Sequence, residues 1–204
     1  MKKKPNIYTC LSPTLLQLYD ISDSIVVIID VLRATSTIAT ALHNGAKAVI
    51  PVDSVADCVR IGNEMNAITA GERDGKIAEG LQYGNSPFEY PASFIANKTL
   101  VLTTTNGTKS LDVAKHAETV VVGSFLNLDA LCKWLETQDK NILCLCSGWQ
   151  DKFNLEDTIC AGAICQYLIG TGDYISDEDS SIAAKYLYLS AKDNYLGYLK
   201  SSSH

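Results

Sequence analysis

The chain has 204 residues, of which 47% are hydrophobic and 20% charged, and this composition is typical of a globular protein with a sizeable buried core. The net charge of −6 argues against non-specific binding to nucleic acid, although a local positive site for a small anion remains compatible with it. No run approaches the ~18 apolar residues of a membrane span, and no clean apolar segment follows the basic N-terminal residues, so we expect a cytoplasmic protein without a membrane partner.

The seven cysteines are an odd number, and several of them lie inside apolar runs. This pattern indicates reduced, buried thiols rather than a disulfide framework. Cys144 and Cys146 would share one face of a strand, but no second cysteine pair is present to complete a zinc site.

Strand and helix signals alternate along the first half of the chain. The run Ile25–Ile29 is continuous and β-branched, as in strands that are buried on both faces. Gly45 is a typical helix stop, and Ser54 is a candidate N-cap for the next helix. The predicted strands here are 25–29, 46–52 and 67–70, and the predicted helices are 35–44 and 54–66.

Residues 72–98 interrupt this alternation with three glycines, two prolines and no clear period. Such long connections are usually functional or disordered. Beyond them, strands are predicted at 99–103, 119–123 and 141–146, and helices at 107–116, 127–137, 155–168 and 181–199. The alternating order predicts an α/β protein with a largely parallel or mixed sheet and helices on both faces.

Four polar clusters follow the ends of predicted strands, which is where ligands bind in parallel α/β sheets. Two of the three arginines, Arg33 and Arg73, lie in these clusters. Helix-start N–H groups, hydroxyls and guanidinium groups are suitable partners for phosphate or sulfonate oxygens. The clusters are residues 30–35, 71–75, 103–108 and 146–148. Their recurrence indicates the rim of a single anion site.

The first two clusters supply acids next to arginines. Asp30 ends a strand and is suited to bind Mg²⁺, to act as a base or merely to bond the next turn. Arg33 and Thr35 open a helix that is able to hold an anion. Glu72 and Arg73 precede a glycine-containing loop. Taken alone, each cluster is equally well explained as an ordinary turn or surface loop.

The last two clusters join strands to helices. Hydroxyl and amide groups at 104–107 can offer several donors to one anion. Ser147 and Gly148 end a strand, and Glu156 and Asp157 open the next helix. Helix capping is the simpler explanation for both clusters, whereas the functional one has Glu156 and Asp157 holding Mg²⁺ with water and a phosphate oxygen.

Five segments, taken together and in order, resemble the 2-phosphosulfolactate phosphatase family. They are residues 30–35, 71–75, 84–87, 103–108 and 155–162. The resemblance implies a Mg²⁺-dependent phosphatase that hydrolyses 2-phospho-3-sulfolactate to 3-sulfolactate and phosphate, a step of the coenzyme M biosynthesis type. It also implies two similar α/β parts with the active site in the cleft between them. We divide the chain accordingly into residues 1–98, with the loop 71–98, and residues 99–204.

Two departures from the family pattern are present. The family tends to have Gly-Phe-Asp before the segment 84–87, whereas this chain has Gly80-Leu81-Gln82 and lacks that acid. Family members also tend to continue beyond the point where this chain ends, so we expect a final strand to be absent here. The resemblance and the apolar face of the last predicted helix are compatible with a homodimer.

The clusters and the resemblance together define a predicted site for a small anionic phosphorylated substrate. The predicted catalytic residues are Asp30, Arg33, Glu72 and Arg73, and the predicted ligands of the Mg²⁺ cofactor are Asp30, Glu156 and Asp157. The predicted substrate-binding residues are Thr35, Asn85, Ser86, Thr104, Thr105, Asn106, Gly107, Ser147 and Gly148. Two alternatives stay open, namely a phosphatase of another small phospho-hydroxy acid and a non-catalytic binding module for a small anionic metabolite.

Overall fold

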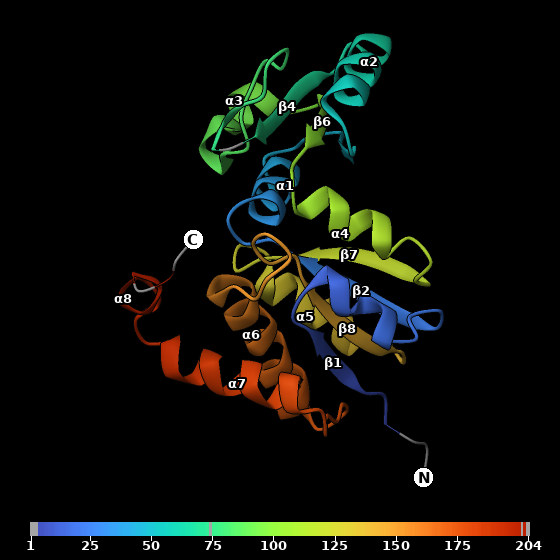
Figure 1. Ribbon diagram of the computed structural model, residues 1–204, viewed down its shortest axis with the longest axis vertical. Helices are drawn as coiled ribbons and strands as arrows, with labels where there is room; N and C mark the ends of the chain where they lie inside the picture. Colours follow the sequence, from blue (N-terminus) through green and yellow to red (C-terminus); the bar gives the residue numbers. More distant parts are fainter. Residues whose placement is uncertain (1–3, 74, 201, 203–204) are drawn as a thin grey trace.

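The computed structural model of the protein describes residues 4–73, 75–200 and 202. The chain forms two four-stranded sheets with helices on their faces, which confirms the predicted α/β class with largely parallel or mixed sheets (Figure 1). One sheet has the strand order β1-β8-β2-β7, and the other has the order β3-β6-β4-β5.

All pairings in the first sheet are parallel. Its strands are β1 (Ile7–Cys10), β2 (Ser24–Ile29), β7 (Thr119–Gly123) and β8 (Asn141–Cys146). Every residue of β2 is buried, because alternate side chains pack on opposite faces of the sheet. Val27 and Ile29 pack in the core on one face of the sheet, whereas Val26 and Ile28 pack in the core on the opposite face.

The helices α5 (Leu128–Glu136) and α6 (Leu155–Thr171) cover one face of the first sheet, and α7 (Asp179–Ala191) packs against α6 and β1. Gly162 makes the close approach of α6 and α7 feasible, since a Cβ atom there would lie 1.9 Å from the Ala184 carbonyl oxygen. The opposite face is covered by the 3₁₀-helix η1 (Pro13–Leu18) and by α4 (Gly107–Val113).

The second sheet contains β3 (Ala48–Pro51), β4 (Ile68–Arg73), β5 (Lys76–Ile77) and β6 (Thr99–Thr103), and only the β4–β5 pairing is antiparallel. On one face, α1 (Ala34–His43) and α3 (Ala92–Ile95) pack on Ala70, Leu100 and Leu102. On the other face lies α2 (Val55–Met65), whose buried Cys58 thiol donates to the Val101 carbonyl oxygen at 3.3 Å.

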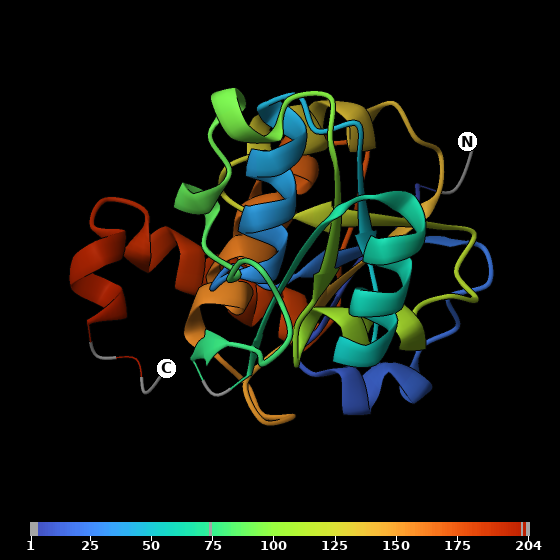
Figure 2. The ribbon, with the colours of Figure 1, turned by 90° about the horizontal axis from the view of Figure 1, so that it is seen from above.

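The strands of the second sheet all lie between β2 and β7 in the sequence. In Figure 1, α1 leads from the first sheet to the second and α4 leads back, so both helices lie at the junction. Figure 2 shows the same arrangement from above, with the helices around the two sheets. Because β6 pairs with both β3 and β4, the second sheet includes strands from either side of residue 98. The division into parts 1–98 and 99–204 stays a prediction.

Most predicted elements agree with the structure within a few residues, and 99–103, 119–123 and 141–146 are reproduced as β6, β7 and β8. Ser54 caps α2 as predicted, since its side chain accepts a hydrogen bond from the Asp57 N–H at 3.0 Å. The strand predicted at 67–70 continues to Arg73 as β4. Residues 72–98 contain β5, the 3₁₀-helix η2 (Pro87–Glu89) and α3.

The prediction of a single helix over 181–199 is wrong. The chain forms α7 and then a separate short helix, α8 (Tyr195–Leu199). The Asn194 side chain accepts a hydrogen bond from the Gly197 N–H at 2.9 Å and so starts a new helix. Within the part of the chain that the structure describes, no helix has both the length and the apolar character that crossing a membrane requires.

Candidate active site

The four polar clusters lie at the carboxyl ends of two pairs of neighbouring strands. Strands β2 and β8 are adjacent and parallel in the first sheet, and β4 and β6 are adjacent and parallel in the second. Between these ends is a pocket of about 200 Å³. Seven of the predicted site residues line it, namely Asp30, Arg33, Glu72, Asn85, Thr104, Thr105 and Asn106. The two sheets therefore contribute to one polar pocket.

Asp30 is fixed where β2 ends, with only 8% of its surface exposed. The Thr35 hydroxyl accepts from the Asp30 N–H at 3.1 Å and donates to the Asp30 carbonyl oxygen at 2.9 Å. The Ala34 N–H donates to Asp30 Oδ1 at 3.3 Å. Thr35 is thus buried and holds the turn, and it does not line the pocket.

Gly107 brings the start of α4 against this turn. A Cβ atom at Gly107 would lie 2.9 Å from Asp30 Oδ2 and 2.7 Å from the Ala34 Cβ. Both approaches are too close for a side chain, so glycine is required where the second sheet returns the chain to the first. Gly107 therefore shapes the wall behind Asp30 and does not itself line the pocket.

Behind Asp30 lies a buried acidic cluster at the start of α6. Asp157 Oδ1 accepts from the Val31 N–H at 2.8 Å, and Oδ2 accepts from the Gly148 N–H at 3.1 Å. The Asn154 side-chain amide donates to Asp157 Oδ2 at 3.0 Å and to Glu156 Oε1 at 3.1 Å. Asn154 was not predicted from the sequence, yet it links both carboxylates. Neither carboxylate lines the pocket.

Burial, and after it the nearby charge of Asp30, raise the pKa of the Asp157 carboxyl to about 8, against the opposing effect of the hydrogen bonds from Val31, Asn154 and Gly148. The two carboxyl groups are therefore close enough to repel each other when both are ionised. A proton or a cation near the pair relieves this repulsion. The neighbouring Cys146 thiol also has its pKa raised well above the usual value, first by burial and then by Asp157.

Arg33 and Glu72 face each other across the pocket, one from the loop after β2 and the other from β4. The Arg33 Nη2 atom forms an ion pair with Glu72 Oε2. Arg73 lies outside the pocket lining, because its Nη1 donates to the Glu72 carbonyl oxygen at 2.7 Å and its Nη2 to Thr103 Oγ1 at 3.0 Å. The predicted catalytic pair Glu72 and Arg73 thus separates into one residue in the pocket and one beside it.

Asn85 enters the pocket from the loop before η2. Its backbone carbonyl oxygen accepts from the Thr37 hydroxyl at 3.0 Å. Its side-chain oxygen is buried and has no hydrogen-bond partner. The adjacent Ser86 begins η2 and its N–H donates to Glu89 Oε1 at 3.3 Å, so Ser86 shapes the loop rather than the pocket lining. This oxygen is available to a hydrogen-bond donor of a ligand or of a water molecule.

The remaining predicted residues divide into lining and supporting groups. Thr105 is exposed and Asn106 is half-buried in the pocket, whereas Thr104 also accepts from the Thr108 N–H at 3.3 Å. Ser147 is buried and accepts from the Ser110 hydroxyl at 2.8 Å. Ser147 and Gly148 therefore support the pocket from behind.

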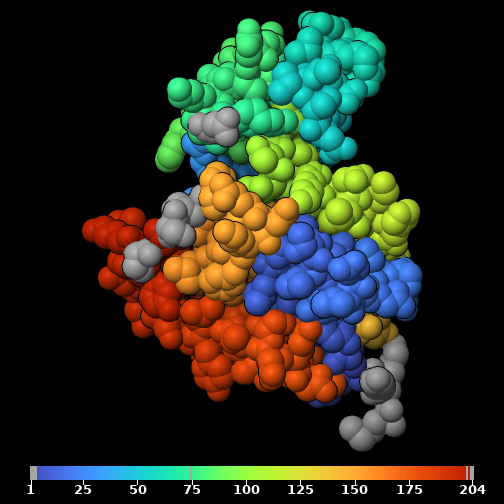
Figure 3. Space-filling view, in the orientation of Figure 1, coloured from blue at the N-terminus to red at the C-terminus, as the bar shows by residue number. Residues whose placement is uncertain are grey.

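Trp149 and Gln150 also line the pocket and were not predicted. They belong to a tight turn in which the backbones of Trp149 and Lys152 exchange two hydrogen bonds of 3.0 Å. Gln150 and Asp151 have left-handed φ angles of 51° and 61°, and Asp151 forms an ion pair with Lys109 of α4. Figure 3 shows the orange segment that contains this turn beneath the green surface of the second sheet. Leu32 and Gly75 complete the lining.

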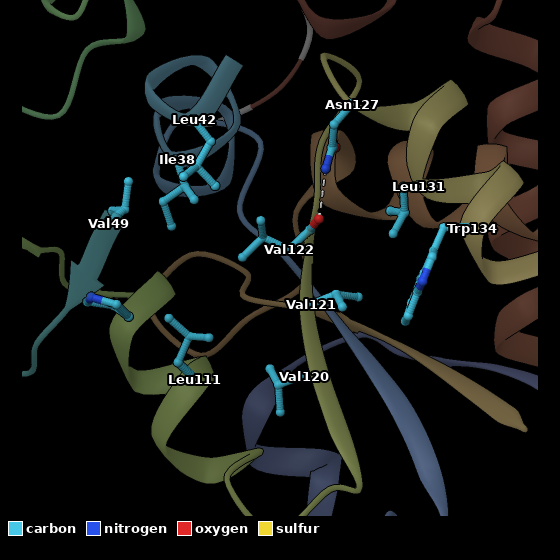
Figure 4. A pocket seen from close by; sticks show the side chains of 11 residues that line it. Ile38, Leu42, Val49, Leu111, Val120, Val121, Val122, Asn127, Leu131 and Trp134 are labelled. Carbon is cyan, nitrogen blue, oxygen red and sulfur yellow. Dashed lines mark hydrogen bonds between the residues drawn. The ribbon is translucent and has the colours of Figure 1, made fainter. Parts of the chain in front are cut away.

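A larger groove of about 480 Å³ lies elsewhere, between α1, β7 and α5 (Figure 4). Its lining is apolar except for Asn127, whose side-chain amide donates to the Val122 carbonyl oxygen at 2.9 Å. None of the described residues that line it is charged. A phosphate group would lose its hydration there without compensation, so the smaller polar pocket is the candidate active site.

Comparison with known sequences identifies the family of the chain. Residues 10–204 match the sequence model of the family described as 2-phosphosulpholactate phosphatase. A relative from Caldanaerobacter subterraneus subsp. tengcongensis, named a probable 2-phosphosulfolactate phosphatase, is 39% identical over 188 residues, which cover 91% of this chain and 78% of the relative. Relatives of the same name from Synechocystis sp. and Picosynechococcus sp. are 40% and 41% identical, and each match covers 87% of this chain and 76% or 75% of the relative. The family predicted from the five motifs is confirmed, and the chain belongs to the 2-phosphosulfolactate phosphatase family.

Proposed function

We propose that this protein is a phosphoric monoester hydrolase that converts 2-phospho-3-sulfolactate to 3-sulfolactate and phosphate. The observation that carries the proposal is the polar pocket, in which Asp30 and Arg33 from the first sheet meet Asn85 and Asn106 from the second. A guanidinium and side-chain amide N–H groups can bind phosphoryl oxygens, and a carboxylate can act at phosphorus or hold a metal ion. Family membership supports the substrate.

The pocket size also supports a small substrate. Its volume of about 200 Å³ is smaller than that of most cofactor and drug-sized ligand sites, which start at roughly 300 Å³. A three-carbon phospho-acid suits such a pocket better than a nucleotide does. Leu81 and Gln82, which depart from the family pattern, do not line the pocket. The Gln82 side-chain oxygen instead accepts from the Thr69 N–H at 3.4 Å. Those departures therefore give little support to another substrate.

We propose Mg²⁺ as the cofactor, with Asp30 as its principal protein ligand. Among the described residues, no group of three or more His, Cys, Asp or Glu side chains is arranged to hold a metal ion. Mg²⁺ is commonly held by one or two carboxylates, waters and substrate phosphate oxygens, so the acids present still fit. Asp157, behind Asp30, is a second candidate, but both of its oxygens already accept N–H groups. Bound Mg²⁺ would neutralise phosphate charge.

The protein groups of the pocket have separate proposed roles. Arg33 and the donors at Thr105 and Asn106 bind the phosphoryl oxygens and stabilise the charge that develops on them. Asp30 acts at phosphorus, either as the attacking carboxylate or as the group that positions the attacking water. Trp149 and Gln150 cover the rest of the substrate and exclude bulk water from it.

A phosphate-release assay with a panel of phosphorylated hydroxy acids tests this proposal. We expect 2-phospho-3-sulfolactate to be the best substrate, with activity lost in EDTA and restored by Mg²⁺. Equal activity under chelation would exclude the metal role. Thermal stabilisation by panel members without phosphate release would instead identify a binding module. Faster turnover of a different phospho-acid would keep the reaction and change the substrate.

The biological setting is proposed from the family as well. We propose that the reaction serves a step of the coenzyme M biosynthesis type in the cytoplasm. A homodimer stays a prediction, and light scattering coupled to size-exclusion chromatography of the purified chain tests it.

A further inference from the structure

Arg33 is the single cationic side chain among the described residues that line the pocket. Among these side chains, Arg33 alone can offer a positive charge to a dianionic phosphate bound there. In the structure its guanidinium is already paired with the Glu72 carboxylate, which lines the same pocket. The second arginine, Arg73, is bonded to Thr103 and to the Glu72 backbone instead. The cation that an anion needs is therefore held by an internal acid.

We propose that Glu72 is a positioning residue that competes with phosphate for Arg33 and thereby keeps the affinity for the product, inorganic phosphate, low. This inference rests on the proposed function, because it assigns the pocket to phosphate. When an anion enters, Arg33 exchanges the carboxylate for phosphoryl oxygens. When inorganic phosphate is the only ligand left, the Glu72 carboxylate pairs with Arg33 again and so assists the release of phosphate.

The surroundings of the Arg33–Glu72 pair keep the free-energy cost of exchanging the carboxylate for phosphate small. The Arg33 side chain is 40% exposed and the Glu72 side chain 25% exposed, so water screens their attraction. A phosphate can accept two parallel hydrogen bonds from a guanidinium and carries more charge than a carboxylate. Phosphate that is also held by the other pocket groups therefore displaces Glu72 from Arg33. Its affinity for the pocket is nevertheless lower than it would be without Glu72.

The backbone of Glu72 is fixed, so that only its side chain needs to move. Glu72 lies in β4 and is opposite Ile77 in the antiparallel pairing with β5. The neighbouring Gly71 is opposite Thr103 in the parallel pairing with β6. The carboxylate thus stays within reach of Arg33 through the whole cycle, which a residue on a free loop would not guarantee.

This role differs in its consequences from a general base. Removing a base lowers kcat about 100-fold or more and leaves phosphate affinity unchanged. Removing a competitor for Arg33 tightens phosphate binding and lowers KM, and it lowers kcat only where product release limits turnover. A residue that merely orients Arg33 would weaken phosphate binding when it is removed.

Calorimetric titration of the full chain with inorganic phosphate, in the presence of Mg²⁺, separates these roles. We expect Glu72→Gln to lower the Kd for phosphate at least about fivefold, since phosphate no longer has to displace a carboxylate from Arg33. Glu72→Ala must show the same change. The matched control is Glu64→Gln, which removes a similar Glu–Arg ion pair with Arg60 on α2, outside the pocket lining, and leaves the Kd unchanged.

A double-mutant cycle with Arg33→Ala tests whether Glu72 acts through Arg33. In the Arg33→Ala background, we expect Glu72→Gln to change the Kd less than about twofold. An equal gain in both backgrounds would show a general field effect and overturn the proposal. Unchanged or weaker phosphate binding in Glu72→Gln, or undetectable binding in every variant, would also overturn it. The titration needs no turnover, so a failure of the proposed hydrolase activity is recorded separately by the release assay.

Discussion

The acids on the first-sheet side, Asp30 at the pocket wall and Asp157 behind it, are buried and accept backbone N–H groups, whereas the acid on the second-sheet side, Glu72, is partly exposed and pairs with a side chain. Asp30 and Asp157 are 8% and 1% exposed. Glu72 is half-buried and Thr105 is exposed, and the Glu72 carboxylate pairs with Arg33 from across the pocket. Each sheet contributes the ends of two adjacent parallel strands to the pocket, but the acids at these ends differ in burial and in hydrogen-bond partners.

This difference indicates that the two sheets have separate roles at the pocket. Backbone hydrogen bonds fix the carboxyl groups, so the negative charge that would attract Mg²⁺ does not move. Contacts between side chains are weaker and are easily exchanged for a ligand. We therefore expect the first sheet to fix where the reaction takes place, and the second sheet to adjust to the substrate and product.

The largest expected effect is that of Asp30→Asn. If the fixed side holds the reacting group, this variant loses about 10³-fold in kcat, because it removes the one carboxylate that the first sheet contributes to the pocket lining among the described residues. Phosphate release from 2-phospho-3-sulfolactate measures the loss, and circular dichroism checks the fold. A loss of less than tenfold would remove Asp30 from the chemistry.

Asn154→Ala sharpens the comparison by loosening the fixed side without touching the pocket lining. It deletes two donors to buried carboxylates, and we expect the free energy of unfolding to fall by about 2 kcal/mol and kcat to fall by roughly tenfold. Urea denaturation and the release assay measure both effects. The control is Asn63→Ala at an exposed position on α2, with a change below about 0.5 kcal/mol. Equal stability of the two variants would show that Asn154 does not position the acids.

Gly107→Ala tests the contact that joins the two sides. The added Cβ would crowd Asp30 Oδ2 and Ala34, and we expect a loss of about 1–2 kcal/mol of unfolding free energy. Gly170→Ala is the matched control, because nothing lies within 4 Å of a Cβ atom at that helical position. It should be neutral or stabilising by up to about 1 kcal/mol. Thermal denaturation that ranks both variants alike would contradict the close approach at Gly107.

The smallest effect concerns pH. The folded-state pKa of Asp157 is raised to about 8, well above its unfolded value, so the folded protein binds the extra proton between roughly pH 4 and pH 8. The free energy of unfolding in EDTA should therefore fall as pH rises from 6 to 8, by an amount of order 1 kcal/mol. Mg²⁺ should reduce the fall if it binds near the pair. Stability that rises over this range in urea titrations would contradict the burial of a protonated carboxyl group.

The sequence predicted the fold where local signals were strong. The apolar β-branched runs gave β2 and β7 within a residue, and Ser54 marked the start of α2. Strand β1 was missed because Ile7–Cys10 is only four residues long and includes the polar Thr9. The break between α7 and α8 depends on the Asn194 side chain accepting a backbone N–H, which competes with a continuous helix.

The site was predictable in its location but only partly in its composition. Strand ends in parallel sheets drew attention to Asp30 and Asn106, both of which line the pocket. Local sequence does not reveal whether a hydroxyl faces a ligand or its own turn, and Thr35 and Ser147 are used for the latter. Asn154 donates to Glu156 and Asp157, which are close to it in sequence. The importance of these hydrogen bonds depends on the burial of the carboxylates by distant strands, which the local sequence does not reveal.

A crystal structure of the protein with phosphate or tungstate bound, in the presence of Mg²⁺, tests most directly whether the two sheets share one anion site. The account predicts a single tetrahedral anion that contacts Arg33 from the first sheet and Asn85 or the Thr105–Asn106 turn from the second, with Glu72 turned away from Arg33. An anion bound by residues of one sheet alone, or at another surface of the molecule, would contradict it.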